Sequence, residues 1–141
     1  MGLVWSQQKV KAIAVMASAA LLLSLSGPTV HADSPMFNFL QHCVGCHQAD
    51  GSGLPPEVPN LRKDFGYLIG SPAGRNFMTR VPGVVGAPLP ASDVARLVNW
   101  MVSSFYPGVA FEPFTEAEIL AGRERPLHDP MKQRVKLIRN E

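Results

Sequence analysis

The chain has 141 residues, a length that suits one small domain and is too short for two. Its 13 basic and 11 acidic side chains give a formal net charge of +2. The sequence contains no basic patch with interleaved aromatic residues, so nothing in it indicates a nucleic-acid partner.

Residues 1–32 have the pattern of a secretory signal peptide. Lys9 and Lys11 form a short basic region, residues 12–25 follow as an uncharged apolar run of 14, and the small residue Ala32 ends the segment. A transmembrane helix needs about 20 apolar residues, so this run is too short to be an anchor. We expect cleavage after Ala32, export to the periplasm and no stable membrane insertion. Without the two lysines, the remaining 11 basic and 11 acidic side chains would give a net charge of zero.

The first helix is predicted over residues 35–46. Ser34 is a suitable N-cap and Pro35 suits the first helical turn. Apolar residues follow at helical spacing, namely Phe37, Leu40 and Val44.

The end of this helix carries the only two cysteines of the chain, in the stretch Cys43-Val44-Gly45-Cys46-His47. A disulfide between them would close a very small loop and would stabilise the fold little. The C-x-x-C-H pattern is typical of covalent attachment of c-type haem. Cys43 and Cys46, one helical turn apart, can form thioethers with the two vinyl groups, and His47 can then supply the proximal iron ligand.

Two other interpretations of the cysteine pair are possible. A thioredoxin-like dithiol would require a βαβ pattern around it, whereas the flanks here are short, helical and rich in glycine and proline. A zinc site would require four ligands, and beyond the motif only His42 and His128 remain in the mature chain.

Residues 37–105 resemble the small mono-haem c-type cytochromes. Beyond the motif, the resemblance rests on Phe39 in the first helix, on the Gly-rich residues 50–53 and on residues 59–61 (Pro-Asn-Leu). It implies an all-α, cytochrome c-like fold in which a few helices surround one covalently bound haem c. It also implies that the Pro59 carbonyl accepts a hydrogen bond from the second nitrogen of His47, which would orient the imidazole.

The strongest helix signal covers residues 91–105, after two shorter helices near 62–70 and 72–80. Its apolar residues form one stripe at offsets 0, 3, 4, 7, 8 and 11, namely Val94, Leu97, Val98, Met101, Val102 and Phe105. Trp100 borders that stripe, and the resemblance implies that it packs against Phe39. The cytochrome domain would then occupy residues 33–106.

Residues 107–141 form a predicted C-terminal extension with one or two short helices. Thr115 and Glu118 fit a capping box, and a last helix can begin at Asp129 and Pro130. This helix would be basic, with Lys132, Arg134, Lys136 and Arg139. It would either pack across the domain as a solvated helix or dock with an acidic redox partner.

The sixth iron ligand is harder to predict. The resemblance implies a methionine directly before a proline, but here Val81 precedes Pro82. Met78 is the best candidate for the distal ligand. Other candidates are His128, Tyr67 and Lys63, and an open site is the remaining alternative.

Two arginines, Arg75 and Arg80, flank Met78. Since haem carries two propionates and guanidinium groups pair well with carboxylates, either arginine is a candidate propionate contact; ordinary solvent exposure is the alternative.

The function that follows is that of a non-enzymatic, one-electron carrier between a dehydrogenase and a terminal acceptor. Its partners would be redox proteins, and it would be a monomer or be attached to a redox enzyme. One alternative is a five-coordinate haem protein that binds or senses CO or NO, and another is a haem subunit of a larger redox enzyme.

Overall fold

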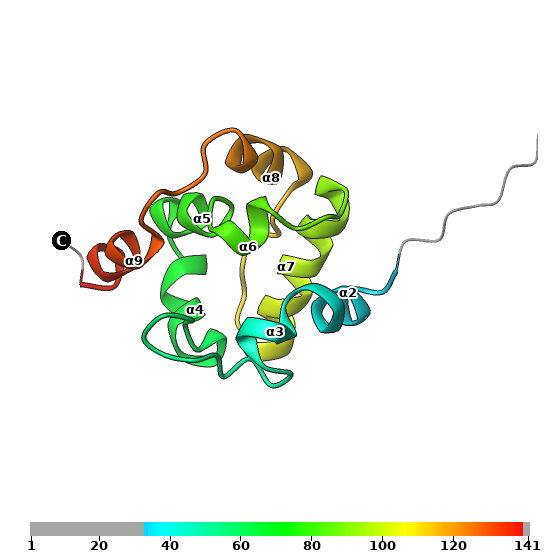
Figure 1. Cartoon of the computed structure of the whole chain (residues 1–141), viewed down its shortest axis with the longest axis horizontal. Helices are drawn as coiled ribbons and strands as arrows, with labels where there is room; N and C mark the ends of the chain where they lie inside the picture. Colours follow the sequence, from blue (N-terminus) through cyan, green and yellow to red (C-terminus); the bar gives the residue numbers. More distant parts are fainter. Residues whose placement is uncertain (1–32, 140–141) are drawn as a thin grey trace, which may run out of the picture. The chain divides into compact units, whose positions relative to one another are not determined.

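The computed structural model describes residues 33–139, so the predicted signal peptide lies outside the described residues. This part of the chain is built from helices (Figure 1). They are α2 (Pro35–His42), α3 (Val44–His47), α4 (Leu61–Ile69), α5 (Pro72–Met78), α6 (Pro82–Val85), α7 (Ala91–Phe105), α8 (Glu116–Arg123) and α9 (Pro130–Arg139). Residues 33–139 contain no strand, only an isolated bridge between Leu54 and Val58. The prediction of an all-α fold is therefore confirmed for the residues that the structure describes.

The first predicted helix is present as two helices. α2 begins as expected, because the Ser34 hydroxyl accepts a hydrogen bond from the N–H of Phe37 at 3.2 Å. The helical geometry is interrupted at Cys43, whose φ and ψ are −120° and −31°. The Cys43 carbonyl then accepts bonds from the N–H groups of Cys46 and His47, at 3.2 and 2.9 Å. This tight turn is α3, which holds Cys46 and His47, with Cys43 at its N-cap.

α4 and α5 pack against each other, and each is capped by a polar side chain. Asn60 caps α4 through a bond from the N–H of Arg62 (2.9 Å), and Ser71 caps α5 through a bond from the N–H of Gly74 (3.0 Å). At Gly74 a side chain would overlap the carbonyl of Leu68, so glycine permits the close approach of the two helices.

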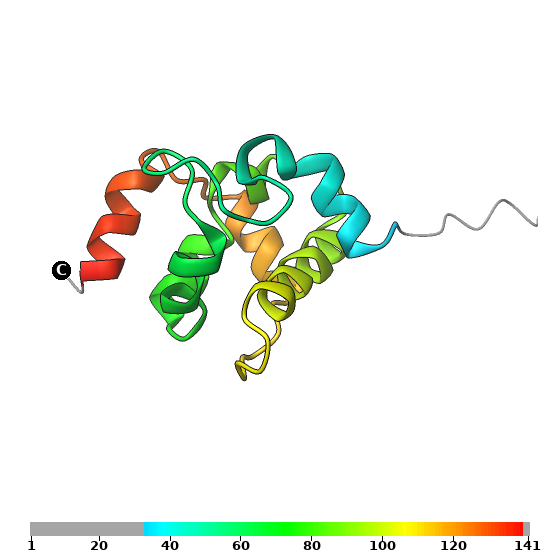
Figure 2. The same cartoon turned by 90° about the horizontal axis from the view of Figure 1, so that it is seen from below.

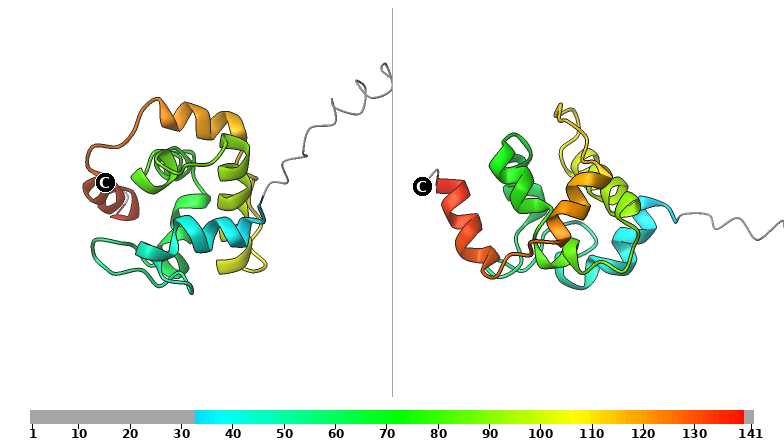
Figure 3. Two further views of the ribbon diagram at one scale, coloured as in Figure 1. Left: turned by 45° about the vertical axis from the view of Figure 1, so that its right-hand side comes forward. Right: turned by 90° about the horizontal axis from the view of Figure 1, so that it is seen from above.

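α7 has the bounds that the sequence predicts, and it packs against α2, α4 and α8 (Figure 3). The predicted contact of Phe39 with Trp100 is confirmed, with ring centroids 5.5 Å apart. Phe105 joins this pair, 5.6 Å from Phe39 in an edge-to-face arrangement. The three rings join the first and the longest helix of the described chain.

The C-terminal extension contributes to the same core. Phe114 and Ile119 are buried, and the Asn99 side chain on α7 bonds to both backbone groups of Phe114, at 2.7 and 2.9 Å. The predicted capping box of Thr115 and Glu118 is present at the start of α8. The extension contains two helices, α8 on α7 and α9 on α4 and α5.

The predicted cap of the last helix is also present, since the Asp129 carboxylate accepts a bond from the N–H of Lys132 at 2.9 Å. Within residues 33–139, none of the helices combines the length and the apolar character needed to cross a membrane.

Candidate cofactor-binding site

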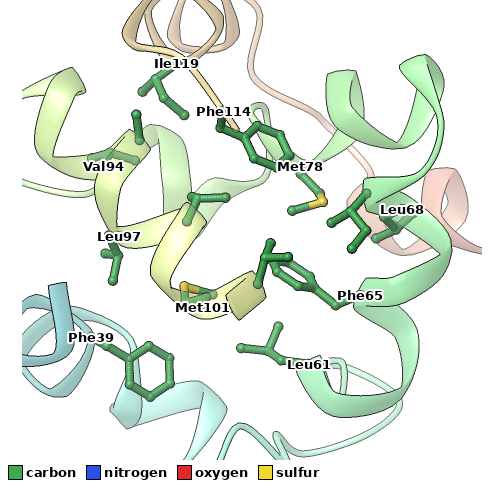
Figure 4. Packing of buried hydrophobic residues seen from close by; sticks show 14 of the residues in the cluster. Phe39, Leu61, Phe65, Leu68, Met78, Val94, Leu97, Met101, Phe114 and Ile119 are labelled. Carbon is green, nitrogen blue, oxygen red and sulfur yellow. The ribbon is translucent and has the colours of Figure 1, made fainter. Parts of the chain in front are cut away.

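A cavity of about 330 Å³ lies between the helices, open to solvent on one side. Its wall is mainly apolar and comes from α4, α5, α6 and α7, with α3 and the start of α9 at other parts of the wall. Figure 4 shows side chains from α4, α5 and α7 that converge on the same space. They include Leu61, Phe65, Leu68, Met78, Leu97 and Met101. A cavity of this size and character is within the range of ligand and cofactor sites.

The cavity is too large to be a packing defect. Protein interiors are normally close-packed, and voids larger than a water molecule are few. The cavity of about 330 Å³ is far larger than such a void, and it is partly open to solvent. Its mainly apolar lining is typical of a site for an apolar ligand.

The C-x-x-C-H motif forms one part of this wall. Cys43, Cys46 and His47 all line the cavity; Cys43 is half-buried and Cys46 is exposed. Neither thiol is in a disulfide. Burial, and then the nearby Cys46, raise the pKa of the Cys43 thiol to about 11. A reactive dithiol has a lowered pKa, so this environment does not favour thiol–disulfide exchange.

His47 is placed as a neutral imidazole at the cavity wall. Burial lowers its pKa, and the carbonyl of Pro59 opposes this by raising the pKa. Nδ1 is buried and has no hydrogen bond of ordinary length and angle among the described residues. The Pro59 carbonyl nonetheless acts on His47 as a hydrogen-bond acceptor in raising its pKa, so the two groups lie close together, as the resemblance implies. Neutral imidazole is the form that binds a metal ion.

The Gly-rich residues 50–53 bring Pro59 to this position. The N–H of Gly53 donates to the carbonyl of His47 at 3.1 Å, and the N–H of Leu61 donates to the carbonyl of Gly51 at 2.8 Å. Gly53 has a positive φ of 66°, and a side chain there would overlap the carbonyl oxygens of Pro59 and Val58. Glycine is required at residue 53 by both its backbone angle and its neighbours.

The candidate distal ligands differ in whether they line the cavity. Met78 is only 4% exposed and lines the cavity, as does Val81. Tyr67 is 71% exposed, and neither it nor Lys63 or His128 is among the residues that line the cavity.

Two further methionines reach the same space. Met101 on α7 and Met131 on α9 line the cavity, whereas Met36 is 56% exposed and does not. Met131 was not expected there from the sequence, because the position of the tail could not be read from a local pattern.

Arg75 and Arg80, the predicted propionate contacts, lie outside the cavity wall and have other partners. Neither residue lines the cavity. The Arg75 guanidinium makes a bidentate pair with Glu118, at 2.8 and 3.0 Å from Nη2, and lies over the Phe114 ring at 4.1 Å. Arg80 donates to the carbonyl of Arg125 and, at 3.0 Å, to the side-chain oxygen of Asn76. Arg75 thus bonds to the C-terminal extension, and Arg80 bonds both to that extension and to Asn76 of α5.

Arg134 is the arginine that lines the cavity among the described residues, and the sequence did not single it out. The available signal was its spacing, since Met131 and Arg134 are three residues apart on the predicted last helix and so share a face. The remaining charged group of the wall is Glu57, which is exposed. In residues 33–139, no three His, Cys, Asp or Glu side chains converge as a metal site.

Comparisons with protein-family models, with curated proteins and with solved structures found no match to this chain. The chemistry of the site must therefore be argued from its own residues.

Proposed function

We propose that this protein is a c-type cytochrome that holds one covalently attached haem c and carries single electrons. The observation that carries the proposal is the position of the C-x-x-C-H motif, whose Cys43, Cys46 and His47 line a large apolar cavity. The proposal is supported because the motif lies on the wall of a mainly apolar cavity and not on an open surface. The proposed cytochrome c-like fold rests on the same observation.

The residues present fit this cofactor. Cys43 and Cys46 would bind it as thioethers, and His47 would provide the proximal nitrogen. When bound, haem supplies a one-electron Fe(III)/Fe(II) couple whose potential depends on the ligands and on burial. The apolar wall from α4, α5 and α7 would shield the bound face of the cofactor from water and lower the local dielectric constant there. Exposed Cys46 leaves one edge of the site near the surface, where a redox partner can approach.

The proposed role is that of an exported, periplasmic electron carrier between a dehydrogenase and a terminal acceptor. Its partners would be redox proteins, with the chain either monomeric or attached to one of them. No substrate chemistry is assigned to its residues, because holding and insulating the cofactor is sufficient for electron transfer.

The test is haem attachment in cells that contain the machinery for c-type cytochrome maturation. We expect denatured wild-type protein to keep its haem in mass spectrometry and to give a c-type pyridine haemochrome spectrum. Cys43→Ala with Cys46→Ala should lose the attached haem. The control, His128→Ala, replaces an exposed histidine away from the cavity and should attach haem normally. Wild-type protein without covalent haem would refute the proposal.

A second candidate function is supported by one observation. Val81 lines the cavity at the place where the resemblance implies a distal methionine. If no methionine binds the iron, the reduced protein would be a five-coordinate haem protein that binds or senses CO or NO. Rapid spectral change on addition of CO to reduced wild-type protein would favour this function, and no change would favour the electron carrier.

A third possibility, a haem subunit of a larger redox enzyme, predicts that the protein elutes with that enzyme in gel filtration of a cell extract. Elution as a monomer would count against it.

A further inference from the structure

The last helix of the described chain closes one side of the cavity. α9 packs against α4 and α5, and Pro130, Met131 and Arg134 line the cavity wall. Figure 2 shows α9 beside the loop that joins α3 to α4. α9 therefore belongs to the site, although the resemblance ends about 25 residues before it.

Arg134 differs from the other basic residues of α9. It is half-buried, whereas Lys132, Lys136 and Arg139 are exposed. Its Nη2 donates to the carbonyl of Pro56 at 2.6 Å, which fixes the guanidinium against the loop that leads to Pro59. This bond restricts the rotamers of Arg134 before any ligand arrives, so a further bond costs less entropy.

The guanidinium of Arg134 has bonding capacity left for a ligand. It carries five N–H donors, and among residues 33–139 the Pro56 carbonyl is its hydrogen-bond partner. Glu57, the acidic residue of the wall, forms no ion pair with it in the described chain. A cation at the wall of an apolar cavity favours a ligand with an acidic group at the corresponding end.

We infer that Arg134 binds a carboxylate of the cofactor in the cavity, and that α9 is the part of the chain that holds the polar edge of that cofactor. This inference rests on the proposed function, since haem is an apolar macrocycle with two propionates. Arg134 thus takes the role that the sequence had suggested for Arg75 or Arg80. It is a positioning residue, because it acts on the cofactor's side chain and not on the iron.

The test compares Arg134→Gln with Arg139→Gln, which removes the same charge from an exposed position of the same helix that does not line the cavity. The reduction midpoint potential of each purified holoprotein is measured by spectroelectrochemistry. A positive charge near the iron favours the reduced state, so Arg134→Gln should lower the potential below that of wild type. Arg139→Gln should stay at the wild-type value. Equal potentials in the two variants would overturn the inference.

A second measurement covers the case in which Arg134→Gln does not fold. Arg134→Lys keeps the charge but loses the planar pair of donors. Its resonance Raman spectrum should show a shifted propionate bending mode relative to Arg139→Lys, and an unshifted mode would refute the contact. Absence of attached haem in the wild-type protein would instead refute the proposed function, so the two failures are distinguishable.

Discussion

Gly53 and Pro59 are in direct backbone contact at the cavity wall, so that any side chain on Gly53 would overlap the Pro59 carbonyl oxygen. The N–H of Gly53 also donates to the carbonyl of His47 at 3.1 Å. Gly53 is thus in contact both with His47, the proposed iron ligand, and with the Pro59 carbonyl beside it.

This contact predicts that Gly53→Ala destabilises the protein by about 2–4 kcal/mol, from the positive φ and the overlap together. The matched control is Gly108→Ala, because Gly108 also has a positive φ (84°) but has open space around it. It should cost about 1 kcal/mol, from backbone strain alone. The free energy of unfolding in urea measures both. If both variants lose the same free energy of unfolding, the contact of Gly53 with Pro59 contributes nothing to stability.

Met78→Leu separates iron ligation from packing. Since Met78 is buried and leucine has a similar volume, the free energy of unfolding should fall by less than about 1.5 kcal/mol. If Met78 is the distal ligand, oxidised Met78→Leu loses the weak methionine–iron charge-transfer band and the reduced form binds CO. Met101→Leu, a change at another cavity-lining methionine, should leave both properties unchanged. A wild-type spectrum in Met78→Leu would remove Met78 as the ligand.

The ion pair of Arg75 and Glu118 should contribute a coupling energy of about 1 kcal/mol, since it is bidentate and both side chains are partly buried, at 16% and 34% exposure. A double-mutant cycle of Arg75→Gln and Glu118→Gln, read by urea unfolding, measures it. The comparison pair, Arg96 with Asp93, has a half-exposed arginine and should give about 0.3 kcal/mol. A coupling at Arg75 no larger than at Arg96 would contradict this view of the C-terminal extension.

The same pair gives stability a pH dependence. Burial alone would raise the pKa of Glu118, but the N–H of Thr115, the guanidinium of Arg75 and the Thr115 hydroxyl together lower it below its ordinary value of 4.5. A lowered pKa of an acid means that the stabilisation is complete above the ordinary pKa and disappears as the pH falls through the lower one. The difference in unfolding free energy between wild type and Glu118→Gln should therefore be constant near neutral pH and shrink in acid. A difference that grows in acid would contradict the assignment.

Phe39→Ala should cost about 3–5 kcal/mol, because its ring is 1% exposed and contacts both Trp100 and Phe105. Phe37 lies on the same helix but is 44% exposed, and Phe37→Ala should cost less than about 1 kcal/mol. Thermal unfolding followed by circular dichroism measures both. Similar midpoints for the two variants would show that the aromatic contact between α2 and α7 does not hold the first helix.

Local patterns predicted the helices well. Ser34, Thr115 and Asp129 all cap helices as expected, because a cap is decided by residues within one turn of each other. The apolar stripe at residues 91–105 likewise predicted both the bounds and the buried face of α7. The break of the first helix at Cys43 was not predicted, since no proline or glycine marks that position.

The site was only partly predictable. The motif located Cys43, Cys46 and His47, because those residues are adjacent in sequence. The roles of Arg75 and Arg134 depend on partners 43 and 78 residues away, at Glu118 and Pro56. No pattern within a single helix contains that information. The sequence therefore favours Arg75 and Arg80, which flank Met78, over Arg134.

The wall of the cavity draws on residues from His42 to Arg134, nearly the whole described chain. A chain that emerges from its N-terminus presents the two cysteines and His47 early, and the closing helix comes last. If the proposed haem is attached, its attachment can precede completion of the fold, and the cofactor would then serve as the template on which α4, α5, α7 and finally α9 assemble. In this order of events the folding reaction and the loading reaction would be one process.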